Sequence, residues 1–220
     1  SYAQLNPDQD AVKIATVFGV NEDIDTAVEE DIWTAGGTRT YPTVAETVNI
    51  TSTSINDTSD GTGARTIVIN GLDVDCNEII ELVTLNGTST VTTTQEFLDV
   101  YRAIVFQSGS LEQNDGDIIL ETSSSSLEMA RIDVGNGISQ KSHYTIPAGY
   151  TGFIMTTTVS VFKADGSGTR QGEISLYVRG AGIASWVKVA VQGIESSVQT
   201  KNWDIPLLIP EKARIKYRGM

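Results

Sequence analysis

The chain of 220 residues is poor in cysteine, histidine and aromatic residues. Its single cysteine, Cys76, cannot form a disulfide within the chain, so stability must come from packing and assembly. We expect Cys76 to be a small buried residue and not a nucleophile. The single histidine, His143, leaves too few ligands for a zinc site and is expected to be structural.

Basic surface charge and long apolar segments are also missing. The formal net charge is −13, and an acidic surface repels phosphates, so no nucleic-acid partner is expected. No apolar run approaches the roughly 20 residues that cross a bilayer, so no membrane partner is expected. The charge is uneven, however: residues 1–50 are acidic and residues 201–220 are basic. Such segments could pair between neighbouring copies.

Motifs for nucleophilic or nucleotide chemistry are absent from the sequence. No Gly-x-Ser-x-Gly elbow precedes a helical segment. The stretch Gly61-Thr62-Gly63 lacks the rest of a dinucleotide fingerprint and the Lys-Ser/Thr of a phosphate loop, and is expected to connect strands. We therefore predict no catalytic residues, no cofactor-binding residues and no enzymatic activity.

Two acidic segments place oxygen ligands at alternate positions, as calcium loops do: Asp73-x-Asp75-x-Asn77 and Asn21-x-Asp23-x-Asp25. An EF-hand loop needs Gly at its sixth position and Glu at its twelfth. Neither segment meets this rule, because the residues at those positions are Glu78 and Thr84 in one and Thr26 and Ile32 in the other. An irregular calcium site and a solvated turn remain the alternatives. The turn is favoured, and no metal site is predicted.

Exposed tryptophans can bind sugars, and the chain has three of them: Trp33, Trp186 and Trp203. They lie far apart in the sequence, and no pair of acids has an apolar, aromatic setting of the kind glycosidases use. We expect Trp186 to lie on a strand and to belong to the core.

Short alternating segments bounded by turn signals such as Asn70-Gly71 recur from residue 46 onward. Strands are predicted over 47–54, 65–70, 77–85, 117–121, 129–134, 151–162, 171–179, 183–191, 201–205 and 213–218. Residues 95–106 fit a helix or a strand, and the β-rich surroundings favour the strand. In the last segment Lys216 and Arg218 alternate with apolar residues, which predicts a half-exposed strand with a free edge.

These patterns predict an all-β protein, a β-sandwich that is either jelly-roll-like or made of two small packed sandwiches. Residues 1–45 are interpreted as an extended N-terminal arm and residues 46–220 as the sandwich core, with a weak subdivision near residue 137. The arm holds apolar residues such as Phe18 and Trp33 that gain free energy only when they are covered. A neighbouring subunit could cover them, or they could fold back onto their own sandwich.

Several stretches together carry a family resemblance: ETVNITSTSINDTSDGTGARTIVINGLD, VTLNGTSTVTTT, YTIPAGYTG and DIPLLIPEKARIKYR. With them, most of residues 20–218 resembles a group of β-rich virion structural proteins of tailed bacteriophages, many of them marine or environmental. The resemblance implies a non-enzymatic virion component, most simply a capsid decoration or head-fibre protein. The alternative is a tail, neck or tail-fibre component with a receptor- or glycan-binding role.

The resemblance implies other virion proteins of the capsid or tail as partners. A homo-oligomer is expected as well, with a trimer favoured. The opening residues show no basic region followed by an apolar stretch, and Ser1 would suit a chain end after removal of Met. The expected location is the virion, assembled in the host cytoplasm.

Overall fold

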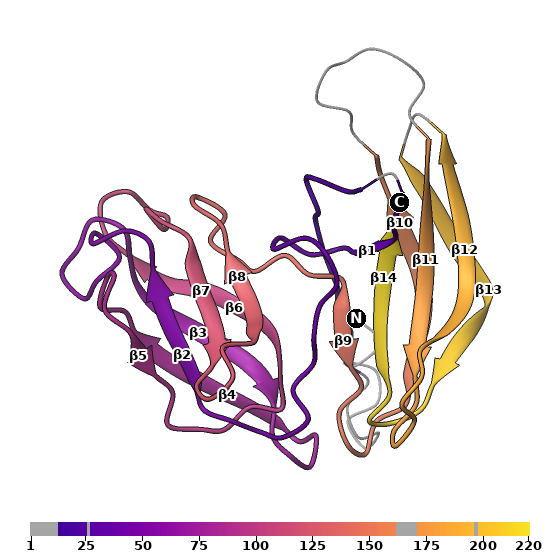
Figure 1. Cartoon of the computed structure of the whole chain (residues 1–220), viewed down its shortest axis with the longest axis horizontal. Helices are drawn as coiled ribbons and strands as arrows, with labels where there is room; N and C mark the ends of the chain where they lie inside the picture. The colour runs from indigo at the N-terminus through magenta and orange to yellow at the C-terminus, as the bar shows by residue number, and fades with distance from the viewer. Residues whose placement is uncertain (1–12, 26, 162–170, 196–197) are drawn as a thin grey trace, which may run out of the picture.

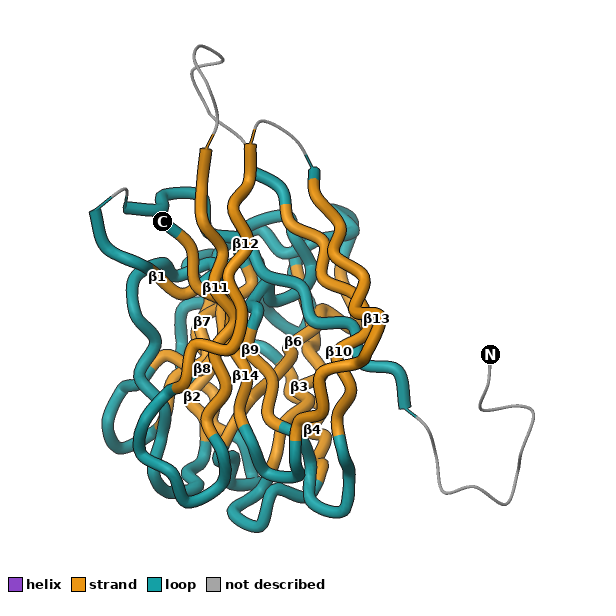
Figure 2. Tube along the Cα trace, turned by 90° about the vertical axis from the view of Figure 1, so that its right-hand side faces the viewer, coloured by secondary structure: helices purple, strands orange, loops and turns teal. Residues whose placement is uncertain are grey.

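The computed structural model describes residues 13–25, 27–161, 171–195 and 198–220, which form strands and loops (Figures 1 and 2). The all-β prediction is confirmed: none of these residues is helical. It follows that no helix among them is long and apolar enough to cross a membrane. The first twelve residues of the expected arm, and residue 162 at the end of one expected strand, lie outside the described part.

The strands form two separate sandwiches, the second of the two predicted alternatives (Figure 1). In the N-terminal sandwich a sheet of order β5-β2-β7-β8 packs on a sheet of order β4-β3-β6. Its strands are β2 (Val48–Ser52), β3 (Ala64–Leu72), β4 (Glu78–Thr84), β5 (Val91–Thr92), β6 (Asp99–Ser108), β7 (Ile118–Thr122) and β8 (Glu128–Ile132). Alternate residues of both sheets point inward, so the core contains fully buried Ile50, Ile67 and Leu120. Phe97, just before β6, is also fully buried in this core.

The C-terminal sandwich joins a sheet of order β1-β14-β11-β12, with β9 also on β14, to a two-stranded ladder of β10 and β13. Its strands are β1 (Glu30–Asp31), β9 (His143–Thr145), β10 (Gly152–Val159), β11 (Gln171–Arg179), β12 (Val187–Glu195), β13 (Gln199–Ile209) and β14 (Arg214–Gly219). Its core is smaller and centres on Leu176, Ile209 and Ile215.

Local sequence patterns placed several elements correctly and others wrongly. Most of the ambiguous segment 95–106 belongs to β6, which runs from Asp99 to Ser108, so the strand interpretation is confirmed. The half-exposed final strand is wrong, because β14 is paired on both sides, by β11 on one and by β1 and β9 on the other, and Lys216 is only 4% exposed. Trp186 lies just before β12 and is half-buried, so it is not a core strand residue.

The loop before β3 is organised by a buried carboxylate, Asp57, which is 0% exposed. It accepts hydrogen bonds from the Ser52 hydroxyl at 2.6 Å and from the backbone N–H groups of Ala64 (2.7 Å), Asp115 (2.9 Å) and Gly116 (3.0 Å). These donors come from β2, β3 and the loop before β7. Asp57 therefore joins both sheets of the N-terminal sandwich at one end.

Replacing this carboxylate should destabilise the protein without changing its sheet pattern. We expect Asp57→Asn to lower the free energy of unfolding by about 3 kcal/mol, because hydrogen bonds to a charged buried group are lost and an amide N–H faces donors. Urea unfolding followed by fluorescence measures this change. The matched control is Asp60→Asn, an exposed acid of the same loop, which should unfold like the wild type. Equal loss in both variants would contradict the role of Asp57.

Candidate functional site

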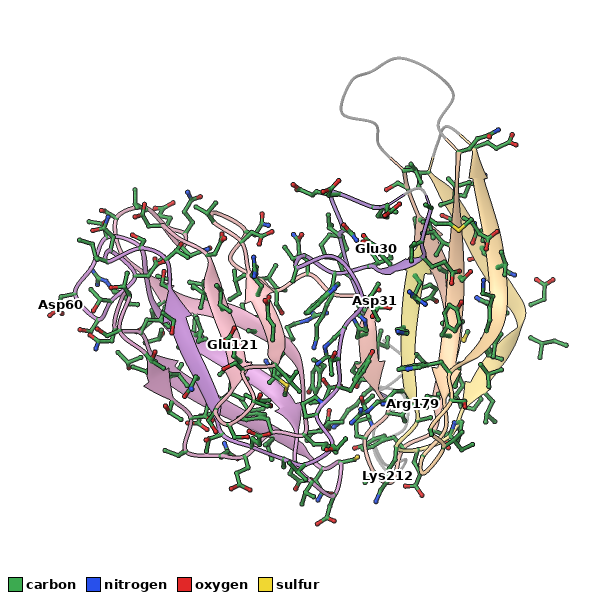
Figure 3. The ribbon with its side chains drawn as sticks, in the orientation of Figure 1. Glu30, Asp31, Asp60, Glu121, Arg179 and Lys212 are labelled. Atoms are coloured by element: carbon green, nitrogen blue, oxygen red, sulfur yellow. The ribbon has the colours of Figure 1, made fainter. Side chains whose placement is uncertain are left out.

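A group of buried charged residues lies between the two sandwiches. It is called the ionic cluster here and consists of Asp31, Arg39, Asp99, Lys141, His143 and Lys216, each at most 4% exposed. Asp99 belongs to β6 of the N-terminal sandwich, whereas Asp31, His143 and Lys216 lie on β1, β9 and β14 of the C-terminal sandwich. Figure 3 shows Asp31 in the space between the two halves.

Asp99 receives three partners from outside its own sandwich. Arg39 lies 2.9 Å from Oδ1, and the Lys141 ammonium lies 3.7 Å from the same atom. The Thr145 hydroxyl donates a hydrogen bond of 2.7 Å to Oδ2. Lys141 also donates to the backbone carbonyls of Val100 and Met129, so one lysine ties the segment just before β9 to two strands of the N-terminal sandwich.

Asp31 plays the matching role in the C-terminal sandwich. Its carboxylate lies 2.8 Å from the Lys216 ammonium, 3.3 Å from Arg218 Nε and 3.5 Å from His143 Nε2. The same carboxylate accepts a hydrogen bond of 2.8 Å from the backbone N–H of Arg39. Arg39 therefore contacts Asp31 through its backbone and Asp99 through its guanidinium.

Burial and neighbouring charges fix the ionisation of the cluster. Burial alone would raise the pKa of Asp99, but Arg39, Lys141 and Arg214 outweigh it and hold that pKa well below its usual range. Burial would also raise the pKa of Asp31, but His143 and Lys216 outweigh this effect and lower the pKa to about 2. Burial lowers the pKa of Lys141 to about 7 and that of His143 to about 4, and the charge of Arg39 adds to both shifts. At neutral pH both carboxylates are charged and His143 is neutral.

Aromatic rings cover one side of the cluster. The Tyr41 ring lies 5.9 Å from the His143 ring and 5.4 Å from the Trp186 ring. Three guanidinium groups surround Tyr41, with centres 4.4 Å (Arg39), 5.1 Å (Arg179) and 5.0 Å (Arg214) from the ring centroid. Such contacts are attractive because a cation faces the negative side of the ring.

The connection between the sandwiches is itself tied to this site. Residue Gly137 accepts a hydrogen bond from the Val105 backbone, and Ser139 exchanges hydrogen bonds with Ala103 of β6. Lys141 then forms backbone bridges with Phe18 and Trp33 of the N-terminal segment. The two sandwiches are thus joined by backbone pairing as well as by buried ion pairs.

The acidic segments that resembled calcium loops form turns in the structure. Asp73 accepts hydrogen bonds from the backbone N–H groups of Asp75 and Asn77, and Asn21 accepts one from Asp23. Across the described part of the chain, no three His, Cys, Asp or Glu residues group as metal ligands would. The side-chain oxygen atoms of Asp73 and Asn21 therefore accept hydrogen bonds from backbone N–H groups of their own turns.

The acidic start and the basic end of the sequence meet within one chain. Glu29 forms ion pairs with Lys188 at 2.8 Å and Arg218 at 3.8 Å, and Asp31 pairs with Lys216. This is the fold-back alternative for residues 29–33, because the two-residue strand β1 adds to β14. Cys76 is 7% exposed as predicted, and burial raises the pKa of its thiol.

A second feature is an apolar patch on the outside of the C-terminal sandwich. The outer patch comprises Phe153 (57% exposed), Met155 (59%), Ile205 (85%) and Leu208 (57%). Phe153 and Leu208 are direct cross-strand partners on β10 and β13, and Met155 and Ile205 lie in the irregular part of the ladder that follows them. On the edge strand β12, the side chains of Val187, Val189 and Val191 are also exposed.

Comparison with models of protein families, with curated proteins and with solved structures finds no match to this chain. The site must therefore be interpreted from its own geometry. The ionic cluster has the burial and mutual pairing of a structural joint, whereas the outer patch has the exposure of a contact surface.

The ionic cluster predicts how stability depends on pH. Because the pKa of His143 is lowered to about 4, the unfolded chain takes up a proton below pH 6.5 while the folded chain does not. The stability that His143 contributes is therefore fully present above pH 6.5 and is lost as pH falls toward 4. Asp31 adds a further loss below pH 4, because its pKa of about 2 lies under the unfolded value of 3.8.

The measurement is urea unfolding at intervals between pH 7 and pH 4.5, for the wild type and for His143→Gln. We expect the wild type to lose stability across this range and the variant to lose less, because it has no imidazole to protonate. Above pH 4.5 the contribution of Asp31 is small in both proteins. Parallel pH profiles for the two proteins would contradict the prediction.

Proposed function

We propose that the protein is a non-enzymatic structural subunit of a tailed-phage virion that works by contact with neighbouring subunits. The family resemblance of the sequence supports the virion, and within it a capsid decoration or head-fibre role. The observation that supports assembly is the outer patch, since four large apolar side chains on adjacent strands remain exposed in the single chain.

Open strand edges next to this patch support the same role. Within the described residues β12 pairs only with β11, and β10 and β13 pair only with each other. An exposed apolar edge promotes association unless a partner covers it. Covering the patch would contribute about 25 cal/mol for each Å² of apolar surface removed from water.

A rigid joint between the sandwiches suits a subunit that must keep its shape in a particle. The ionic cluster and the backbone pairing of residues 137–141 connect the halves at several points. The N-terminal sandwich has a well-filled core, and the C-terminal sandwich carries the outer patch. The N-terminal sandwich also exposes large apolar residues, among them Ile80, Leu82 and Phe106. We assign attachment to the C-terminal sandwich and a homo-oligomer, with a trimer favoured, as the assembled form.

Substitutions in the outer patch test this proposal. We expect Phe153→Ser and Leu208→Ser to reduce self-association in sedimentation velocity and to reduce the occupancy of the protein in purified virions, because apolar contact area is lost. Val74→Ser is the matched control: Val74 is 64% exposed but lies in a turn of the N-terminal sandwich. The control should behave like the wild type.

The proposal fails if the wild-type protein is a monodisperse monomer at high concentration and is also absent from purified virions. It fails equally if the patch variants join particles with unchanged occupancy while remaining folded by circular dichroism.

A further inference from the structure

Next to the ionic cluster lies a pair of arginines without carboxylate partners. Arg179 ends β11 and Arg214 begins β14, and the two are direct cross-strand neighbours. Like charges in such positions repel each other. Neither side chain forms an ion pair with a carboxylate among the described residues; each is held only over aromatic rings. In Figure 3, Arg179 lies on the side of the C-terminal sandwich that faces the other half.

The nearest buried acid is already committed to other groups. Asp99 Oδ1 is occupied by Arg39 at 2.9 Å and faces Lys141 at 3.7 Å. Asp99 Oδ2 accepts the hydroxyl of Thr145 at 2.7 Å. Asp99 therefore makes its direct ion pairs with Arg39 and Lys141. It attracts Arg214 and Arg179 only from a greater distance, and one carboxylate does not balance all four cations.

Buried donors beside this pair are also unpartnered. The Nε and Nη1 atoms of Arg39 and the hydroxyl of Tyr41 are buried and form no hydrogen bond of good geometry among the described residues, although the two side chains attract each other. Buried donors are normally satisfied, so these atoms call for an acceptor. Arg39, Arg179 and Arg214 all lie within 5.1 Å of the Tyr41 ring centroid, which brings the free donors and the excess charge into one place.

We infer that Arg39, Tyr41, Arg179 and Arg214 form a binding site for an oxyanion, carried by a carboxylate or a phosphate group. Guanidinium groups suit this ligand because their planar N–H pairs match two oxygens at once. Trp186 forms one wall, with Arg179 and Lys216 each 4.7 Å from its ring. Arg179 and Arg214 are only partly buried, so the ligand enters from their side. This inference stands apart from the proposed virion role.

The site also accounts for a local positive charge in a protein whose net charge is negative. The protein carries a net charge of −13, yet three arginines and Lys216 gather around two rings. Burial and the neighbouring Arg214 lower the pKa of Arg179 from its ordinary value, which reflects the cost of this crowding. A bound anion would relieve that repulsion.

Isothermal titration calorimetry with inorganic phosphate and, separately, with acetate tests the site, both in chloride buffer of constant ionic strength. We expect saturable binding of one anion per chain. Binding of phosphate alone identifies a phosphate-type ligand, and binding of acetate identifies a carboxylate. Arg214→Gln and Arg179→Gln should each weaken binding by about tenfold or more, since a charge-assisted hydrogen bond is lost.

The matched control is Lys201→Gln, which removes a cation 4.3 Å from the Trp203 ring in the same sandwich. It should bind as the wild type does. Thermal unfolding adds a second readout: the anion should raise the midpoint of the wild type and the control more than that of the arginine variants. Because phosphate stabilises proteins generally by exclusion, only this difference counts. Absence of saturable heat with both anions, or equal binding by folded Arg214→Gln, overturns the site.

Discussion

The contact between the two sandwiches depends on one residue, Arg39, which binds a buried acid in each of them. Arg39 donates its backbone N–H to Asp31 of the C-terminal sandwich and its guanidinium to Asp99 of the N-terminal sandwich. Both acids are buried. Removing the guanidinium would leave Asp99 with Lys141, 3.7 Å away, as its one remaining ion pair among the described residues, and weakening a buried pair costs far more than losing a surface ion pair. The segment from Asp31 to Arg39 therefore fixes how the two sandwiches meet.

The two sandwiches differ in core size, and the C-terminal one carries the outer patch. In the N-terminal one, both sheets contribute side chains with almost no exposed area, and Asp57 joins their ends. In the C-terminal one, a two-stranded ladder covers a larger sheet, and large apolar residues remain on its outer side. A sandwich with so thin a second layer gains much from a neighbour, which is consistent with the proposed assembly role.

The sequence allowed prediction of the strands but not of the joint. Alternation placed elements such as β3 and β11 because one face of each is apolar, and such patterns are local. The ionic cluster draws on residues 31, 39, 99, 141, 143 and 216, which no spacing relates. Lys216 was expected in water because charged residues alternated with apolar ones; in fact both faces of β14 are covered, and its charge meets Asp31. Only the opposite charges of the chain's two ends hinted at this contact.

The pairing of β1 with β14 has a consequence for how the protein is made. Asp31 leaves the ribosome before its partner Lys216, which follows 185 residues later. At ordinary rates of synthesis, the gap lasts on the order of 10 s. The whole N-terminal sandwich is produced within that interval, from sequence that lies between the paired strands. It can collapse on its own core, while Asp31 stays solvated until β14, the strand that encloses it, has been synthesised.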